Sequence, residues 1–139
     1  MNKEIISNIF CNQVINVGLL YNEAINTKET IANILCDQVI NIGLLYDEAI
    51  NTKVTISIKN VENVSRFNNR IKGILTYVNN LYFEYEAGII DYNYVINEMY
   101  HLYTFINCTY KYNEGTFCFK TINSMKDVIN ETIENLTNI

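Results

Sequence analysis

The 139-residue sequence contains no proline, no tryptophan and only one histidine. It also contains no run of 18 apolar residues of the length that a membrane-spanning helix requires. The first residues, Met1 to Glu4, lack the basic and apolar pattern of a secretory signal. The four cysteines, Cys11, Cys36, Cys108 and Cys118, include no CxxC pair, so we expect free thiols in a soluble, cytoplasmic protein.

Catalytic signatures are missing as well. The motifs HExxH, GxGxxG, GxxxxGK[ST] and GxSxG do not occur, which disfavours the zinc, dinucleotide, P-loop and hydrolase classes. The single histidine, His101, has no partner cysteine or second histidine at metal-ligand spacing. The sequence therefore predicts a protein that is not an enzyme and that takes no cofactor and no metal.

The composition favours one folded domain over residues 1–139. Hydrophobic residues make up 49% of the chain and charged residues 18%, which is enough apolar material for a core. The formal net charge of -5 argues against a generally basic nucleic-acid binder. The bias towards Asn and Ile, without Pro or Trp, is typical of an AT-rich genome and favours a virus, a phage or a low-GC bacterium as the source.

A tandem repeat occupies the N-terminal third of the chain. The first repeat, residues 6–28, and the second repeat, residues 31–53, match at 18 of 23 positions. The five differences are conservative: Ser7/Ala32, Phe10/Leu35, Asn12/Asp37, Val17/Ile42 and Asn22/Asp47. Two copies are fewer than a solenoid needs, so the repeat predicts a duplicated helix.

Each copy has the apolar pattern of an amphipathic helix. In the first repeat one face carries Ile6, Ile9, Phe10, Val14, Val17, Leu20, Tyr21 and Ala24. An offset of 25 residues is close to seven helical turns, so one continuous helix would place both copies on nearly the same stripe. We favour instead a helical hairpin, because Asn26 and Glu29 have capping-box spacing and would start a second helix near Thr27. In that arrangement both stripes are buried, and Asp at Val14 or Val39 would destabilise the fold.

The rest of the chain returns to helical periodicity after a short alternating segment. Residues 54–58 alternate like a short strand or form an extended linker. A seam then predicts a long central helix, packed within the domain or shared between chains: Val64, Phe67, Ile71, Ile74, Val78, Leu81 and Tyr85. Gly88 should end that helix, and Asp91 should cap the next one, whose inward face would be Val95, Met99, Leu102 and Ile106.

Two alternating runs around a glycine predict a β-hairpin at about residues 108–121. Ser124 and Asp127 have capping-box spacing and should start a terminal helix that buries Met125, Val128, Ile129, Thr132, Ile133 and Leu136. The expected fold class is mainly α with a small β-hairpin, at the margin of α+β. It has an N-terminal helical hairpin, a long central helix and a C-terminal helix.

Tyrosine is concentrated between residues 77 and 112, in a segment that is also acidic. Tyrosine offers a large rigid face with a polar tip and is favoured at protein interfaces. The predicted binding residues are therefore Tyr92, Tyr94, Tyr103, Tyr110 and Glu98. A basic stretch just before this segment gives an alternative nucleic-acid or nucleotide site, in which aromatic and cationic groups are interleaved: Arg66, Arg70, Lys72 and Tyr77.

These patterns predict a non-enzymatic protein that binds another macromolecule. The expected partner is a protein, the chain is expected to be a homo-oligomer such as a homodimer, and no membrane is involved. An inhibitor, immunity or anti-defence protein of a virus, phage or mobile element fits the composition. The nucleic-acid binder is one alternative, and a viral groove binder of the death-suppressor type is another, although the latter needs an exposed apolar groove.

Overall fold

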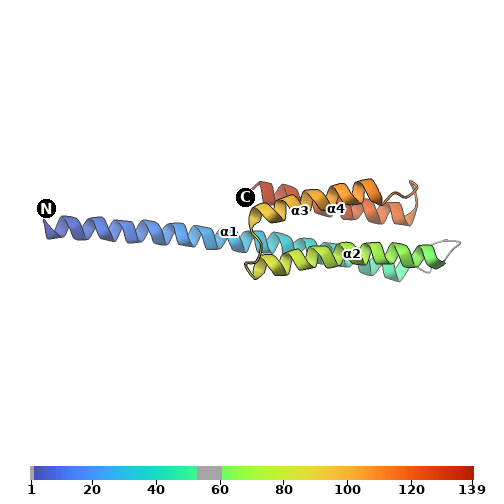
Figure 1. The fold of residues 1–139 in the computed structure, drawn as a ribbon, viewed down its shortest axis with the longest axis horizontal. Coiled ribbons are helices and arrows are strands. Elements are labelled where there is room, and N and C mark those ends of the chain that lie inside the picture. Colours follow the sequence, from blue (N-terminus) through green and yellow to red (C-terminus); the bar gives the residue numbers. More distant parts are fainter. Residues whose placement is uncertain (1, 53–60) are drawn as a thin grey trace. The chain divides into compact units, whose positions relative to one another are not determined.

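The computed structural model describes residues 2–52 and 61–139, with side chains at all of them except 19–26 and 61–63. These residues form four helices and no strand: α1 (Lys3–Thr52), α2 (Val61–Glu86), α3 (Tyr92–Thr109) and α4 (Phe117–Thr137) (Figure 1). The prediction of a mainly helical chain is confirmed. The predicted strand at 54–58 lies outside the described residues.

The chain divides into two compact units, Met1–Ile31 and Ala32–Ile139. The larger unit is a four-helix bundle made of the second part of α1 with α2, α3 and α4, and successive helices run in opposite directions (Figure 1). Each helix contributes residues that are almost fully buried, among them Leu35, Ile42, Phe67, Ile71, Met99, Ile106, Met125 and Ile129. The bundle therefore has one continuous apolar core.

The predicted N-terminal hairpin is wrong, because α1 continues without a break from Lys3 to Thr52. The expected helix start at Asn26 to Glu29 lies inside this helix. This segment contains neither glycine nor proline, the two residues that most strongly oppose helix continuation. Capping-box spacing alone did not indicate a break in the helix.

The seam predicted for the central helix is confirmed and lies inside the bundle. Val64 is half-buried, and the other six positions are exposed by 6% or less: Phe67, Ile71, Ile74, Val78, Leu81 and Tyr85. Gly88 ends this region with φ 75°, where its N–H donates to Tyr85 and the Ile89 N–H donates to Glu84. This pair of bonds is a Schellman motif, which favours glycine at the left-handed position.

The predicted start and inward face of α3 are also confirmed. The Asp91 carboxylate accepts a hydrogen bond from the Tyr94 N–H at 2.8 Å, as an N-cap does. All four predicted inward residues, Val95, Met99, Leu102 and Ile106, are buried.

The predicted β-hairpin at 108–121 is wrong. α3 extends to Thr109 and α4 begins at Phe117, so only the short connection between them is non-helical. Thr116 caps α4, because its hydroxyl accepts from the Phe119 N–H at 3.2 Å. α4 then buries residues at helical spacing: Cys118, Thr121, Ile122, Met125, Ile129, Thr132, Ile133 and Leu136. The predicted start at Ser124 is therefore also wrong, while the predicted buried face of this helix is confirmed except at Val128, which is half-buried.

Candidate binding surfaces

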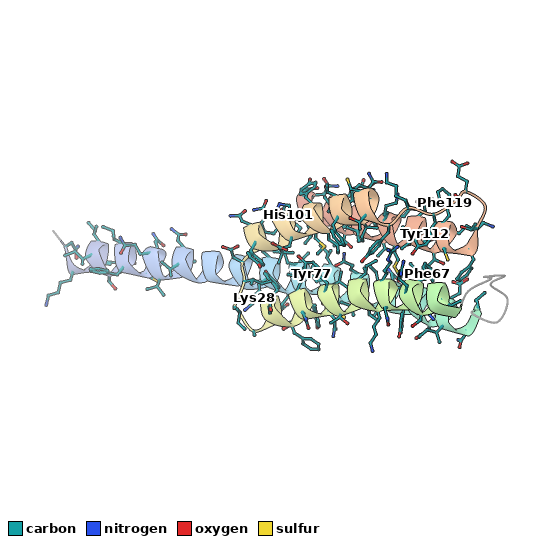
Figure 2. The ribbon with its side chains drawn as sticks, turned by 45° about the vertical axis from the view of Figure 1, so that its right-hand side comes forward. Lys28, Phe67, Tyr77, His101, Tyr112 and Phe119 are labelled. Carbon is teal, nitrogen blue, oxygen red and sulfur yellow. The ribbon has the colours of Figure 1, made fainter. Side chains whose placement is uncertain are left out.

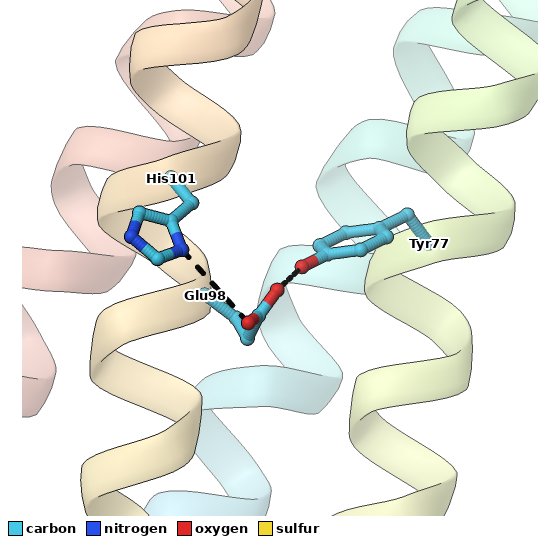
Figure 3. A network of polar contacts seen from close by, with 3 residues as sticks. All are labelled: Tyr77, Glu98 and His101. Atoms are coloured by element: carbon cyan, nitrogen blue, oxygen red, sulfur yellow. Dashed lines mark hydrogen bonds and ion pairs between the residues drawn. The ribbon is translucent and has the colours of Figure 1, made fainter.

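Two residues from rival predicted sites meet between α2 and α3. The Tyr77 hydroxyl donates a hydrogen bond to Oε2 of Glu98, and Nδ1 of His101 lies 3.9 Å from the other carboxylate oxygen (Figure 3). Burial, followed by the hydrogen bond to Glu98, raises the pKa of Tyr77 far above its usual value. Tyr77 therefore stays protonated and joins the two helices.

A second cluster joins the start of α2 to the connection before α4. The Arg70 guanidinium lies 4.8 Å from the centroid of the Tyr110 ring and donates to the Tyr112 hydroxyl at 3.0 Å. The Tyr112 ring in turn makes an edge contact with Phe67 at 5.5 Å between centroids (Figure 2). Burial raises the pKa of Tyr110, and the positive charge of Arg70 partly opposes that rise. Arg70, a residue of the predicted nucleic-acid site, is thus engaged in aromatic contacts within the bundle.

The other predicted site residues are spread over the bundle. The Tyr92 hydroxyl donates to the carbonyl oxygen of Leu136 at 2.7 Å and so connects α3 with the end of α4. Tyr94 is 47% exposed, whereas Tyr103 is half-buried. Lys72 is exposed on α2. The five predicted protein-binding residues therefore do not form one cluster, and the side chains of three of them, Tyr92, Glu98 and Tyr110, have partners within the fold.

A pocket lies between α1 and α4, lined by Ile34, Asp37, Gln38, Ile40, Asn41, Val128, Glu131, Thr132 and Asn135. Its lining is largely polar, unlike the apolar groove that a death-suppressor protein presents. Gln38 is 1% exposed, and its amide nitrogen donates to the Met99 sulfur at 3.1 Å. Its amide oxygen has no hydrogen-bond partner among the described residues.

The described residues contain neither a cluster of metal-ligating side chains nor a helix suited to crossing a membrane. Nowhere in 2–52 and 61–139 do three or more His, Cys, Asp or Glu side chains gather as metal ligands would. Over the same residues, no helix combines the length and the apolar character needed to cross a membrane.

The clearest feature outside the bundle is the apolar face of the first repeat. We call Ile6, Phe10, Gln13 and Val17 the first-repeat stripe. Ile6, Phe10 and Val17 are 38%, 63% and 65% exposed. Their counterparts in the second repeat are Ile31, Leu35 and Ile42, and these are exposed by 3% or less. Gln13 is likewise exposed, whereas its counterpart Gln38 is buried. One sequence pattern thus occurs once buried and once exposed.

Sequence reasoning did not find this surface, because two nearly identical repeats predict the same burial for both. A usable signal did exist in the sequence. Residues 61–139 supply three helices, and one further helix is enough to complete a four-helix bundle with them, which leaves one copy of the repeat over. A comparison with protein-family models, curated proteins and solved structures finds no match for this chain.

Proposed function

We propose that this protein acts by binding a helical protein through the first-repeat stripe. The observation that carries this proposal is the contrast between the two repeats. The second repeat uses the same pattern to pack into the core of a helical bundle, whereas the first repeat exposes it. A surface with the sequence of a core-packing helix is suited to helix-on-helix contact.

The extent of the exposed surface supports the same function. Ile9 and Val14 are also exposed, at 47% and 72%, and flank the stripe on the helix surface. Single exposed apolar residues are ordinary, but a contiguous apolar patch marks an interaction site. The second repeat indicates the chemistry of the partner: an apolar, helical surface with a polar group that can face a glutamine.

The nucleic-acid alternative has less support. Arg70 is committed to Tyr110 and Tyr112, and Tyr77 donates to Glu98, whose carboxylate would repel a phosphate. The predicted tyrosine surface is also secondary, because Tyr92 and Tyr110 already hold elements of the bundle together. An inhibitory or anti-defence role is compatible with a binding protein, and its support is the composition of the chain alone.

Affinity capture from cells of the source organism tests the proposal. The double variant Phe10→Asp/Val17→Asp places two charges on the stripe and should lose the captured partner, because a buried unpaired charge opposes helix packing. Asn12→Asp is the matched control, since it adds a charge to an exposed position of the same helix at which the second repeat carries Asp37. The proposal fails if the double variant captures the same partner as the wild type.

The tyrosine surface is tested in the same experiment. Tyr94→Ala removes the exposed tyrosine without touching the first repeat. Loss of capture in Tyr94→Ala, with capture retained in Phe10→Asp/Val17→Asp, would move the binding surface to α3.

A further inference from the structure

We infer that the larger unit binds a small phosphorylated molecule in a pocket beside Tyr110, with the phosphate group held by Arg66 and Arg70. The pocket lies within residues 32–139 and shares no residue with the first-repeat stripe. The inference therefore goes beyond the proposed function, and each can fail without the other.

The pocket is built mainly on one side of α2. It is lined by Ser65, Arg66, Asn69 and Arg70 of this helix and by Tyr110, which directly follows α3. Arg66 and Arg70 are four residues apart, and so are Ser65 and Asn69, so each pair lies together on the helix surface. Guanidinium, hydroxyl and amide groups all donate hydrogen bonds, and phosphate oxygens accept them. The lining thus supplies the donors that a phosphate group requires.

Arg70 is already held in position at this pocket. Its guanidinium lies over the Tyr110 ring and donates to the Tyr112 hydroxyl. A guanidinium carries five N–H donors, so one bond to Tyr112 leaves donors for a ligand. A side chain that is ordered before binding loses less conformational entropy when the ligand arrives. The same contacts prevent Arg70 from following an extended nucleic-acid strand, which is why we infer a small ligand.

The charge around Tyr110 favours an anion. A neighbouring pocket shares Tyr110 and is lined by Lys111 and Lys126. The two pockets together contain four cationic side chains, and none of the described residues that line them is Asp or Glu. The chain as a whole carries a net charge of -5, so this local positive charge is opposite in sign to the rest of the molecule. A phosphate monoester carries a charge of about -1.5 to -2 at pH 7 and gains more from this field than chloride does.

The size of the pocket indicates what carries the phosphate group. Its volume of about 440 Å³ is larger than a phosphate ion and lies within the range of about 300–1,000 Å³ that is typical of small-molecule sites. Apart from the Tyr110 ring its lining is polar, which suits a sugar phosphate or a nucleoside monophosphate. The pocket between α1 and α4 would repel the same ligand, because it is lined by Asp37 and Glu131.

A nuclear magnetic resonance titration of the full chain with inorganic phosphate tests the inference, with sodium chloride at matched ionic strength as the reference. The backbone amide signals of Ser65, Asn69 and Tyr110 should shift and saturate with phosphate but not with chloride. The signals of Asp37 and Glu131 should not move, because their pocket carries the opposite charge.

Three variants identify the groups that hold the phosphate. Arg66→Gln removes a charged donor at an exposed position and should weaken phosphate binding on the order of 10-fold. Arg70→Lys keeps the charge but loses the planar fork, and it should weaken binding by a similar factor. Lys72→Gln is the matched control, since Lys72 is exposed on the same helix but does not line the pocket. Its effect should stay within about twofold, because salt screens a charge that makes no contact with the ligand. Unchanged signals elsewhere in each spectrum show that the variant remains folded.

Two results would overturn the inference. One is the absence of saturable shifts at Ser65, Asn69 and Tyr110, or equal shifts with chloride. The other is equal weakening by Lys72→Gln and Arg66→Gln, which would mean that phosphate responds to general charge and not to the pocket. None of these variants alters the first-repeat stripe, so protein capture through the stripe is tested independently.

The carrier of the phosphate group is identified by comparing three further ligands. Tighter binding of adenosine monophosphate than of ribose 5-phosphate would place an aromatic base beside Tyr110, and equal binding would limit recognition to the sugar phosphate. Either result supports a small phosphorylated ligand. A short single-stranded oligonucleotide that binds more tightly than both, and that also shifts the signal of Lys72, would overturn it in favour of a nucleic acid.

Discussion

At the scale of single residues, Tyr77 links the stability of the bundle to pH. Burial and the hydrogen bond to Glu98 hold its pKa above the ordinary value of 10.0. The unfolded chain therefore loses this proton near pH 10 while the folded chain keeps it, so the stabilisation is complete below pH 10 and decreases as the pH rises above it. We expect the fall in melting temperature between pH 9 and pH 11 to be smaller in Tyr77→Phe than in the wild type.

Thermal melts over this pH range test the prediction. Burial also raises the pKa of Tyr82, Tyr85 and Tyr110, so part of the alkaline loss should remain in the variant. Tyr100→Phe is the control, because Tyr100 is 49% exposed. Identical pH profiles for wild type and Tyr77→Phe would contradict the role given to Tyr77.

Arg70 is the second residue with a stabilising role. Arg70→Ala removes a cation–π contact with Tyr110, worth about 0.5–1 kcal/mol, and a hydrogen bond to Tyr112, worth about 1 kcal/mol. We expect the free energy of unfolding to fall by about 1–2 kcal/mol. Lys72→Ala, at an exposed position of the same helix, should change it by no more than about 0.5 kcal/mol. Urea denaturation measures both, and equal effects would mean that Arg70 contributes through charge alone.

At the scale of helices, the two repeats provide a matched pair of substitutions. Leu35 is fully buried, so Leu35→Ala should cost about 2–5 kcal/mol of unfolding free energy through lost burial and a cavity. Phe10 occupies the equivalent position but is 63% exposed, so Phe10→Ala should change this free energy by about 0.5 kcal/mol at most. Denaturation at low micromolar concentration, monitored by circular dichroism, distinguishes the two. Equal losses would show that the first repeat is buried as well.

Helices in which the apolar periodicity is sustained over several turns were predictable from the sequence. The seam from Phe67 to Tyr85, the inward face of α3, the glycine that ends α2 and the aspartate that caps α3 are all confirmed. Each of these signals is local, or repeats over several turns. Periodicity sustained over several turns distinguishes a helix from a strand, and Gly88 and Asp91 act within three residues of their own positions.

Short patterns were less informative. The run from Thr116 to Thr121 alternates like a strand, yet it also supplies an N-cap at Thr116 and buried residues at Cys118, Thr121 and Ile122. Over so few residues both periods fit, and packing against α3 determines which one forms. Side-chain contacts between helices could not be predicted from the sequence, because no sequence pattern links Tyr77 to Glu98 or Arg70 to Tyr110.

At the scale of the whole molecule, the chain contains two similar helical segments, but the bundle has one site that buries their pattern. The second repeat occupies it, and the two repeats differ at three positions that are buried in the second: Ala32, Leu35 and Ile42. The first repeat carries serine, phenylalanine and valine there. Valine in place of Ile42 would leave a small void that costs about 0.5–1.5 kcal/mol of unfolding free energy. Phenylalanine in place of Leu35 would overfill the site at a cost of about 1–3 kcal/mol. These differences give a physical reason why the second repeat is the buried one.

Two deletions of 25 residues test this preference directly. Removing residues 4–28 keeps the second repeat, whereas removing residues 29–53 joins the first repeat to Val54 in the register of the second. Both proteins should form the same four-helix bundle, because the two repeats agree at 18 of 23 positions. The protein that keeps the first repeat should be less stable by about 1.5–4.5 kcal/mol, the sum of the costs of the void and of the overfilled site. Urea denaturation measures this difference. A protein lacking residues 29–53 that does not fold would mean that the bundle discriminates between the repeats by more than packing at these three positions.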